Sequence, residues 1–443
     1  MAAESLTVWM DGFKSPAGHL DRSGDGNSSF SYEAAYLDEQ GLPLSMSLPL
    51  TTAEYGDVAT RAFFANLLPE NAQLQRILDR EGLERNDVVG LLGHLGADCP
   101  GAVSCLPIGH PPVKTPGVLN LDYEALDDTA AIRIVRSLAE LQKLPADVDD
   151  PSPVAGVQSK IALTVLSDGR FALPKTGSGV PTTHILKVPQ RRHGRDARLE
   201  EASALLADAV GLDVSVPQAV KVGDYDALLI ERFDRRVMDG VVTRIHQEDF
   251  AQALGFPSDL KYQRRGRPGR WFDVEAALSV LDQTRDPEAS RLGFILATLF
   301  NLCIGNTDNH AKNHGLLYDN GPCPRFAPLY DLLPIRLDPD YTHQLAFNIG
   351  KATLFDEMSP GDLESFLMAC GVEALPAFVG DAVAPLVEAL EGATPSLRSA
   401  GLRQFDNLIG RETQRLVDLL SAAVGVRERD SFQDRGGGWL TSS

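Results

Sequence analysis

The stretch Gly305-Asn-Thr-Asp-Asn-His-Ala-Lys-Asn313 decides the fold that we expect for this chain. Within it, Asp308 and Asn313 stand in the pattern Asp-x-x-x-x-Asn. The catalytic loop of protein kinases has this spacing, and there the Asp accepts the proton of the substrate hydroxyl while the Asn holds a magnesium ion. A single match of this kind is more often a turn or a helix cap, so the interpretation depends on what surrounds it.

A second acidic residue follows a short apolar segment, in Tyr330-Asp-Leu332. Magnesium binds through a few carboxylate or amide oxygens and phosphates, and it keeps several waters. Asn313 and Asp331, on separate loops, therefore form a candidate magnesium site. His310 and His314 are half of an alternative metal site, but no third ligand motif lies near them in the sequence.

Residues upstream offer the charges that a bound nucleotide needs. Lys187 closes a predicted strand at residues 184–188, where its ammonium can neutralise phosphate oxygens, and Glu200 in the next helix is a candidate ion-pair partner. The small residues of 154–160 allow backbone N–H groups to approach phosphate. Taken alone, Lys187 would be a solvated charge at a sheet edge. The order of all these elements along the chain favours the kinase interpretation.

The hydrophobic pattern predicts a β-rich lobe followed by a helical lobe. The run Ser167-Asp-Gly-Arg170 is a hairpin turn between two strand-like runs, because Asp-Gly tolerates positive φ. From about Gln247 onward the pattern is helical. One apolar stripe there must be buried, and it consists of Leu292, Ile295, Leu296, Leu299 and Phe300.

We therefore expect an α+β chain with a bilobal, protein-kinase-like fold behind a small α/β N-terminal domain. Strand-like runs at 6–10 and 45–50 belong to that first unit, and the prolines and glycines of 109–117 end it. The expected units are residues 1–110 for the N-terminal domain, 118–246 for the β-rich lobe with the phosphate loop, 247–430 for the helical lobe with the catalytic loop, and 431–443 for a disordered tail.

The composition narrows the possible classes of protein. The chain has 443 residues, 43% of them hydrophobic, which indicates a globular protein of two or three units. Lys and Arg total 41 against 61 Asp and Glu, and the net charge of −20 argues against a chain that binds nucleic acid by itself. Five scattered cysteines without a CxxC pair predict free, buried thiols in a reducing compartment. No apolar stretch approaches about 18 residues, so we expect a cytoplasmic protein without membrane contact.

Several longer motifs occur together along the chain. In the N-terminal unit they are Phe64-Ala-Asn-Leu-Leu-Pro-Glu70 and Gly96-Ala-Asp-Cys-Pro-Gly-Ala102. In the two lobes they are Ala155–Lys160, Thr183–Lys187, Glu231–Arg235, His246–Phe250 and Asn306–Asn313. With these motifs the chain resembles, over nearly its whole length, the HipA family of toxin Ser/Thr kinases from type II toxin–antitoxin systems.

The resemblance implies a HipA-type N-terminal domain and a kinase with ATP and Mg²⁺ between its lobes. Asp308 would be the general base, Lys187 the phosphate-binding lysine, and Asn313 and Asp331 the magnesium ligands. Glu231, Arg232 and Phe233 would form the hinge that contacts adenine. The other nucleotide-binding residues would be Ala155, Gly156, Val157, Gln158, Ser159, Lys160, His310, Ala311, Lys312, Asn313, Tyr330 and Asp331.

The resemblance also implies a substrate and partners. Family members phosphorylate a serine of an aminoacyl-tRNA synthetase, typically the glutamyl-tRNA synthetase, which inhibits translation and causes growth arrest or persistence. A small, basic helix-turn-helix antitoxin, HipB-like, neutralises the toxin and forms an autorepressing complex with it. Contact with DNA is therefore expected only through the antitoxin.

One position departs from the family pattern. The loop before Ala155 usually carries an autophosphorylated serine two residues ahead of that alanine, where this chain has Pro153. Ser152 and Ser159 are the candidates to replace it, and we expect autophosphorylation to be altered or moved.

Other interpretations stay open. The basic clusters at 191–195 and 264–270 are either solvated loops or contacts for a tRNA-bound synthetase or a substrate phosphate. A small-molecule kinase of the aminoglycoside type shares the Asp-x-x-x-x-Asn spacing, but it has no place for the N-terminal motifs or for His246-Gln-Glu-Asp249. A catalytically weak kinase fold that acts mainly as an antitoxin-bound co-repressor is disfavoured, because Lys187, Asp308, Asn313 and Asp331 are all present.

Overall fold

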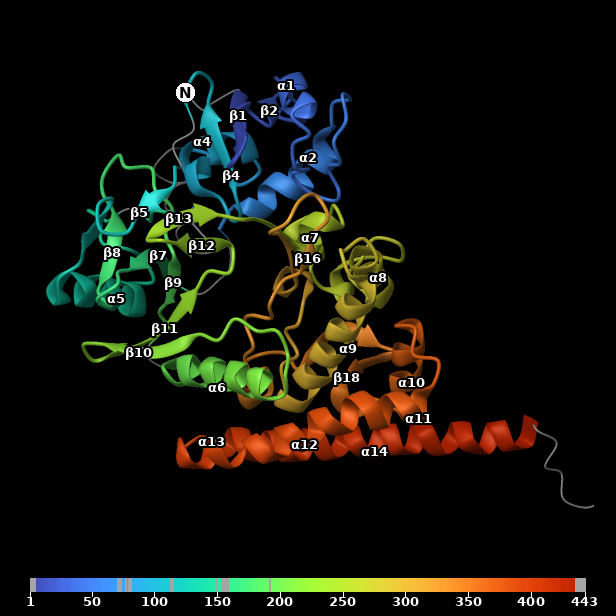
Figure 1. Cartoon of the computed structure of the whole chain (residues 1–443). Coiled ribbons are helices and arrows are strands. Elements are labelled where there is room, and N and C mark those ends of the chain that lie inside the picture. The colour runs from blue at the N-terminus through green and yellow to red at the C-terminus, as the bar shows by residue number, and fades with distance from the viewer. Residues whose placement is uncertain are drawn as a thin grey trace, which may run out of the picture.

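The computed structural model of the chain describes residues 5–69, 74–75, 78, 82–111, 115–148, 150–152, 159–190 and 193–434. In Figure 1 an N-terminal domain lies above two lobes, with the β-rich lobe on the left and the helical lobe on the right. This is the expected α+β organisation. Some residues of the predicted site lie outside the described ranges, namely Ala155, Gly156, Val157 and Gln158, and so do Pro153, Arg191 and Arg192.

The N-terminal domain is an antiparallel sheet packed against helices. The strand order is β3 (Ser28–Tyr32), β2 (Gly18–Arg22), β1 (Ser5–Met10) and β4 (Val103–Pro107). Alternate apolar side chains of the strands share one core with α2 (Asp57–Phe64) and α4 (Val88–Leu95). The strand expected at 45–50 was wrong. Only an isolated bridge joins Ser45 to Leu48, because Pro43 and Pro49 cannot donate ladder hydrogen bonds.

The β-rich lobe is built on a six-stranded antiparallel sheet. The predicted Asp168-Gly169 turn joins two of its strands, and Gly169 has a φ of 84°, which L side chains rarely adopt. In order, the strands are β10 (Gln218–Val222), β11 (Tyr225–Glu231), β9 (His184–Lys187), β7 (Lys160–Val165), β8 (Phe171–Pro174) and β6 (Tyr123–Ala125).

Side-chain alternation in this sheet places two lysines on one face. Ile161 of β7 and Leu186 of β9 are registered partners, and both belong to the core formed with α5 (Asp128–Leu141). Lys160 and Lys187 are also registered partners. Because successive side chains of a strand point to opposite faces, both lysines lie on the face away from α5.

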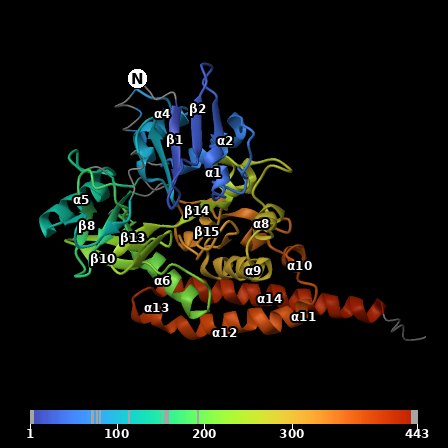
Figure 2. The same ribbon diagram turned by 45° about the horizontal axis from the view of Figure 1, so that its top comes forward.

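The second lobe is helical, as expected, but it also contains two small antiparallel sheets. One is β14 (His246–Asp249), β15 (Gly315–Tyr318) and β16 (Arg325–Phe326), and Figure 2 shows β14 and β15 below the strands of the N-terminal domain. The other is β17 (Gln344–Ile349) with β18 (Ala352–Leu354). The longer helices are α8 (Val274–Leu281), α9 (Pro287–Ile304), α10 (Pro360–Ala369), α12 (Ala384–Ala393) and α14 (Arg403–Asp434).

Helix α9 is the central element of this lobe, and it leads directly into the predicted catalytic loop. Asp286 caps its start by accepting a hydrogen bond from the N–H of Ala289, and Pro287 occupies the first turn. Gly305 ends it in the left-handed conformation, with φ 71°. The predicted stripe was wrong at Leu292, which is 42% exposed because this side of the first turns of α9 faces solvent. Ile295, Leu299 and Phe300 of the stripe are buried, and Leu296 is half-buried.

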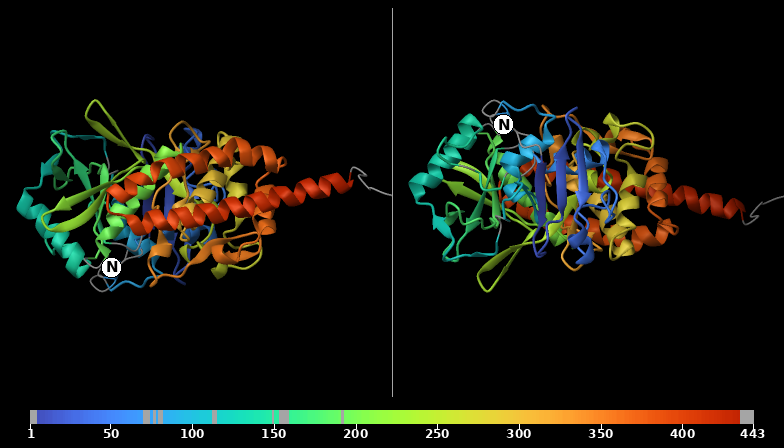
Figure 3. Two further views of the ribbon diagram at one scale, coloured as in Figure 1. Left: turned by 90° about the horizontal axis from the view of Figure 1, so that it is seen from below. Right: turned by 90° about the horizontal axis from the view of Figure 1, so that it is seen from above.

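Helix α14 lies across the underside of the molecule and packs on α9 and α10 (Figure 3). Its far end projects beyond the rest of the chain in Figure 1. The tail predicted from residue 431 begins too early, because the helix continues to Asp434. None of the helices in the described ranges is long and apolar enough to cross a membrane. All five cysteines are free, and four are buried as expected, but Cys323 is exposed.

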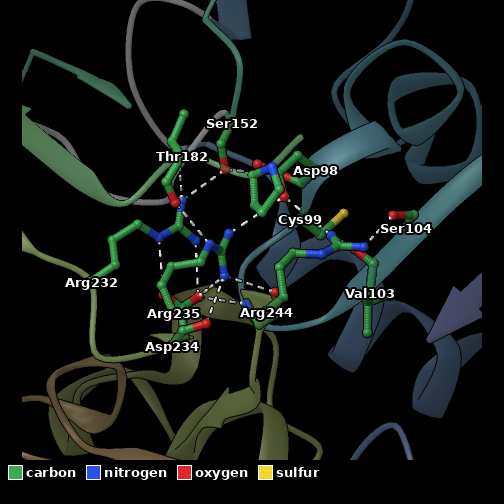
Figure 4. Close-up of polar contacts among 12 residues, drawn as sticks. Asp98, Cys99, Val103, Ser104, Ser152, Thr182, Arg232, Asp234, Arg235 and Arg244 are labelled. Atoms are coloured by element: carbon green, nitrogen blue, oxygen red, sulfur yellow. Dashed lines mark hydrogen bonds and ion pairs between the residues drawn. The ribbon is translucent and has the colours of Figure 1, made fainter. Parts of the chain in front are cut away.

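A buried ionic cluster joins the N-terminal domain to the β-rich lobe (Figure 4). Asp98 of the N-terminal domain accepts from Arg244 at 3.1 Å and from Arg235 at 3.4 Å, and Arg244 also pairs with Asp11 at 2.5 Å. Asp234 pairs with Arg235 at 2.9 Å. The side chains of Asp98 and Arg244 are fully shielded from solvent. Charges of both signs are thus matched across a largely buried junction, where an unmatched charge would be costly.

We expect Arg244→Met to lower the free energy of unfolding by about 3–5 kcal/mol, because it leaves Asp98 and Asp11 without their shared partner in a buried site. Urea unfolding followed by circular dichroism measures this loss. Arg236→Met removes an exposed arginine of the neighbouring strand β12 (Arg235–Met238) and is the matched control. Equal stability of the two variants would contradict the prediction.

Candidate active site between the two lobes

A cleft of about 520 Å³ lies between the lobes. It is bounded by the central strands of the β-rich lobe, the segment that follows β11, and the loop that follows α9. Ser152, Ser159 and Ala311 do not line it. The predicted site residues that line it are Lys160, Lys187, Glu231, Arg232, Phe233, Asp308, His310, Lys312, Asn313, Tyr330 and Asp331.

Lys187 joins the two sides of this cleft. Its Nζ lies 2.8 Å from Glu200 Oε1 in α6 (Arg195–Ala209) and 2.5 Å from Asp331 Oδ1 in the helical lobe. The predicted pair with Glu200 is therefore confirmed. Lys187 is not a solvated edge charge, because β9 lies between β7 and β11 and the side chain is only 12% exposed.

The backbone and charge of Asp331 are both unusual. Asp331 has a φ of 59°, a left-handed conformation that few non-glycine residues adopt, although aspartate adopts it more readily than most. Burial acts to raise the pKa of its carboxyl, but the ammonium of Lys187 outweighs burial and holds that pKa at about 2. Asp331 is therefore ionised at neutral pH, as a metal ligand must be.

Asp308 is held from three directions. Its backbone N–H donates to Asn306 Oδ1 at 3.1 Å, and its carbonyl accepts from Asn313 Nδ2 at 2.9 Å. The Tyr262 hydroxyl donates to Asp308 Oδ1 at 2.7 Å. Burial raises the pKa of Asp308, the charge of Asp331 raises it further, and the Tyr262 hydrogen bond acts against both. Tyr262 thus occupies Oδ1 and leaves Oδ2 available in the residue that lines the cleft, and a raised pKa suits a proton acceptor.

Lys312, predicted to contact ATP, lines the cleft and is also bonded to the N-terminal domain. Its Nζ donates to Asp249 Oδ2 at 2.7 Å and to Asn66 Oδ1 at 2.9 Å. Its backbone carbonyl accepts from the Tyr330 hydroxyl at 2.7 Å. Lys312 therefore contacts the N-terminal domain, Asp249 at the start of α7 (Phe250–Ala253), and Tyr330, which precedes Asp331.

The two histidines have separate environments, which removes the alternative metal site. His314 lies among the rings of Phe250, Phe272 and Phe294, and burial lowers its pKa to about 4. Within the described ranges, no group of three or more His, Cys, Asp or Glu side chains is placed to hold a metal ion. His310 instead lines the cleft, with its ring edge-on to Tyr262.

Neighbouring side chains hold two residues of the hinge segment in different places. Phe233 packs against Tyr330 with ring centroids 5.6 Å apart. The Arg232 guanidinium points into the buried cluster, where it pairs with Asp234 and donates to the Ser152 hydroxyl at 2.9 Å (Figure 4). Ser152 is fully buried and donates in turn to the carbonyl of Asp98. Phosphorylation of Ser152 stays a prediction. It requires Ser152 to leave the buried position in which it contacts Arg232 and Asp98.

The cleft suits a magnesium-bound nucleotide. Ile185 and Ile230, registered partners on neighbouring strands, offer an apolar wall, while Lys160 and Lys187 offer ammonium groups. Asn313 and Asp331 provide the amide and carboxylate oxygens that magnesium prefers. The Nδ1 atom of His310 is buried, and among the described residues it has no hydrogen-bond partner.

Sequence reasoning missed several residues of this site. Tyr262 and Arg264 line the cleft. In the sequence, Arg264 stands out only as part of a basic run, and Tyr262 only lies just before that run. Asn66 and Asp249 were visible as members of motifs, without a role. No local pattern shows that they meet Lys312, because Asn66 and Lys312 are 246 residues apart.

Comparisons with known proteins agree with this architecture. The family models for the HipA N-terminal domain and the HipA-like C-terminal domain match residues 6–106 and 152–390. A putative kinase of Sinorhizobium fredii, Y4mE, is 37% identical over 374 residues, which cover 84% of this chain and 87% of the relative. The serine/threonine-protein kinase toxin HipA of Shewanella oneidensis is 30% identical over 350 residues, or 76% of each chain.

A solved structure supports the fold. The complex of Shewanella oneidensis HipA with HipB and its operator DNA contains a chain that matches with a TM-score of 0.73 and 23% identity, covering 95% of this chain and 97% of that one. The two family models and the curated relatives together show that this chain belongs to the HipA family of Ser/Thr kinases.

Proposed function

We propose that the chain transfers the γ-phosphoryl group of ATP to a serine hydroxyl of a protein. The observation that carries the proposal is the convergence of Lys187, Asp308, Asn313 and Asp331 in one cleft, with Lys187 bound to both Glu200 and Asp331. Positioning and charge neutralisation provide most of the rate in such transfers, because the transition state is loose.

In the proposed reaction, Asp308 orients the serine hydroxyl and accepts its proton at Oδ2, since Tyr262 occupies Oδ1. The serine oxygen forms a bond to the γ-phosphorus, the bond to the bridging oxygen of ADP breaks, and ADP leaves. Lys187 and Lys160 bind phosphate oxygens. Asn313 and Asp331 would hold Mg²⁺, which when bound neutralises phosphate charge.

We further propose that the chain is the toxin of a toxin–antitoxin pair, and that it modifies an aminoacyl-tRNA synthetase, glutamyl-tRNA synthetase first among them, with or without bound tRNA. Growth arrest by blocked translation would follow. The relative from Shewanella named a kinase toxin supports the first part. The synthetase is carried over from the resemblance of the motifs.

A HipB-like antitoxin is the proposed partner. The structurally similar Shewanella HipA was solved with HipB and operator DNA. The net charge of −20 favours a small basic partner and contact with DNA only through it. A small-molecule kinase is disfavoured, because the N-terminal domain reaches the catalytic loop through Asn66 and Lys312.

Asp308→Asn should lower phosphate transfer by about 100-fold or more, because it removes the proton acceptor. The assay is labelling of purified, tRNA-bound glutamyl-tRNA synthetase with radioactive ATP. ATP affinity, measured by calorimetry, should stay near that of the parent protein. Retained labelling by the variant would remove Asp308 from the mechanism, and a parent protein that does not label the synthetase would count against this substrate.

ATP should bind more weakly as the pH rises from about 7 to about 9. Burial, and then the charge of Lys187, lower the pKa of Lys160 to about 8, and only its ammonium form attracts phosphate. Above that pKa the free protein has lost the proton that binding requires, so affinity falls by up to about tenfold per pH unit. Calorimetry across this range measures the slope. In Lys160→Met the affinity should be low and nearly independent of pH, and a slope equal to that of the parent protein would refute this origin.

Asn66→Ala should lower kcat by about 10- to 100-fold with little change in the KM for ATP, because Lys312 loses its anchor in the N-terminal domain and the loop carrying Asp308 and Asn313 loosens. Asn27→Ala, in the exposed turn between β2 and β3, is the matched control. Steady-state kinetics measure kcat and the KM for ATP of both variants, and thermal unfolding verifies that both are folded. A kcat equal to that of the control would show that this contact only supports the fold.

A further inference from the structure

The segment from residue 261 to 270 carries four arginines beside the proposed base. They are Arg264, Arg265, Arg267 and Arg270, and together they form the arginine cluster. None of the four forms an ion pair with an acid in the part of the chain that the structure describes. Arg264 does donate a hydrogen bond to the carbonyl of Leu345 at 3.4 Å. Acidic residues outnumber basic ones by 61 to 41, so arginines that gather in one place without an acidic partner are unexpected unless they bind something.

The arginine cluster is attached to the catalytic machinery. The Arg264 guanidinium carbon lies 3.9 Å from the centre of the Tyr262 ring, and the hydroxyl of that ring donates to Asp308. Arg265 approaches the same ring at 5.8 Å. Arg264 also lines the cleft together with Asp308. An anion held by these guanidinium groups would therefore lie next to the acceptor hydroxyl.

The segment is held in a defined shape. The N–H of Ala311 in the catalytic loop donates to the carbonyl of Lys261 at 3.1 Å, and the N–H of Asn348 in β17 donates to Gln263 Oε1 at 2.6 Å. Arg267 and Arg270 form an isolated bridge across a tight turn with Gly269 at φ 79°. Arginines on a fixed loop lose less conformational entropy on binding than arginines on a mobile one.

We propose that the arginine cluster binds acidic side chains of the protein substrate within a few residues of the serine that is phosphorylated. This inference rests on the proposed kinase function and names the substrate class of that site. Arginine pairs with carboxylates through two parallel hydrogen bonds, which gives orientation as well as attraction. In an extended peptide each residue advances about 3.3 Å, so side chains near the acceptor serine reach a loop that borders Asp308.

A peptide is favoured over a nucleic acid by the charge around the cluster. Binding to RNA depends on many phosphate contacts spread over a wide basic surface. Here four arginines stand in a chain with a net charge of −20, which would repel the rest of a polyanion. The phosphates of ATP have their own cations in Lys160 and Lys187 on the opposite lobe.

The test uses two synthetic peptides that differ only in the residues around a serine, with Glu in one and Gln in the other. The parent protein should phosphorylate the Glu peptide with a kcat/KM about tenfold higher, and added salt should reduce the difference. Arg265→Glu with Arg267→Glu should abolish or reverse this preference and should favour a third peptide with Lys at the same positions. The KM for ATP should stay within about twofold, since neither Arg265 nor Arg267 lines the cleft and Arg264 is kept.

Arg403→Glu, an exposed arginine at the start of α14 and outside the cleft lining, is the control and should keep the preference. Equal phosphorylation of all three peptides by the parent protein would overturn the inference and leave the kinase function standing. Conversely, charge-dependent binding of the Glu peptide, seen by fluorescence polarisation without any phosphorylation, would support the inference and count against the kinase function. The inference would also be overturned if Arg265→Glu with Arg267→Glu weakened the binding of tRNA but not of the Glu peptide, or if it changed only the KM for ATP.

Discussion

One buried ammonium group connects the two lobes of this protein. Lys187 extends from the middle of the β-rich sheet and binds Glu200 in α6 and Asp331 in the helical lobe. Burial alone would lower the pKa of this lysine, but the two carboxylates outweigh burial and raise it above its ordinary value. The same contact keeps Asp331 ionised. The charge of Lys187 thus connects the two sides of the cleft and keeps the proposed metal ligand ionised.

Polar contacts link the N-terminal domain to both lobes. On one side, Asp98 neutralises Arg235 and Arg244 at the base of the β-rich lobe. On the other, Asn66 receives Lys312 of the catalytic loop, and Ser45 donates to the buried Glu248. Buried polar groups of this kind tolerate only one arrangement, since any shift leaves a donor or a charge unmatched. The domain therefore restricts how the two lobes can sit relative to each other.

Predictions from the sequence were correct where a feature depends on neighbouring residues, and wrong or incomplete where it depends on residues far away in the chain. The hairpin at Asp168-Gly169 was readable because the conformation of a glycine in a tight turn is a local property. The strand expected at 45–50 and the burial of Leu292 were wrong, because neighbouring prolines and the position of a helix in the lobe overrode the apolar pattern. For Lys312, the residue was correctly placed in the cleft, but its partners come from distant parts of the chain.

The sequence by itself determined the chemistry that is available: the order of Lys187, Glu200, Asp308, Asn313 and Asp331 follows that of a kinase, and spacing within one loop is preserved on folding. It also determined that the chain is acidic and to which family it belongs. Only the tertiary structure decided which charges meet. Lys187 and Asp331 are 144 residues apart, and Asn66 and Lys312 are 246 apart, so their pairing depends on how the lobes pack. The tertiary structure likewise showed that the Arg232 guanidinium is paired with Asp234 inside the junction, whereas Arg264 of the basic run lines the cleft.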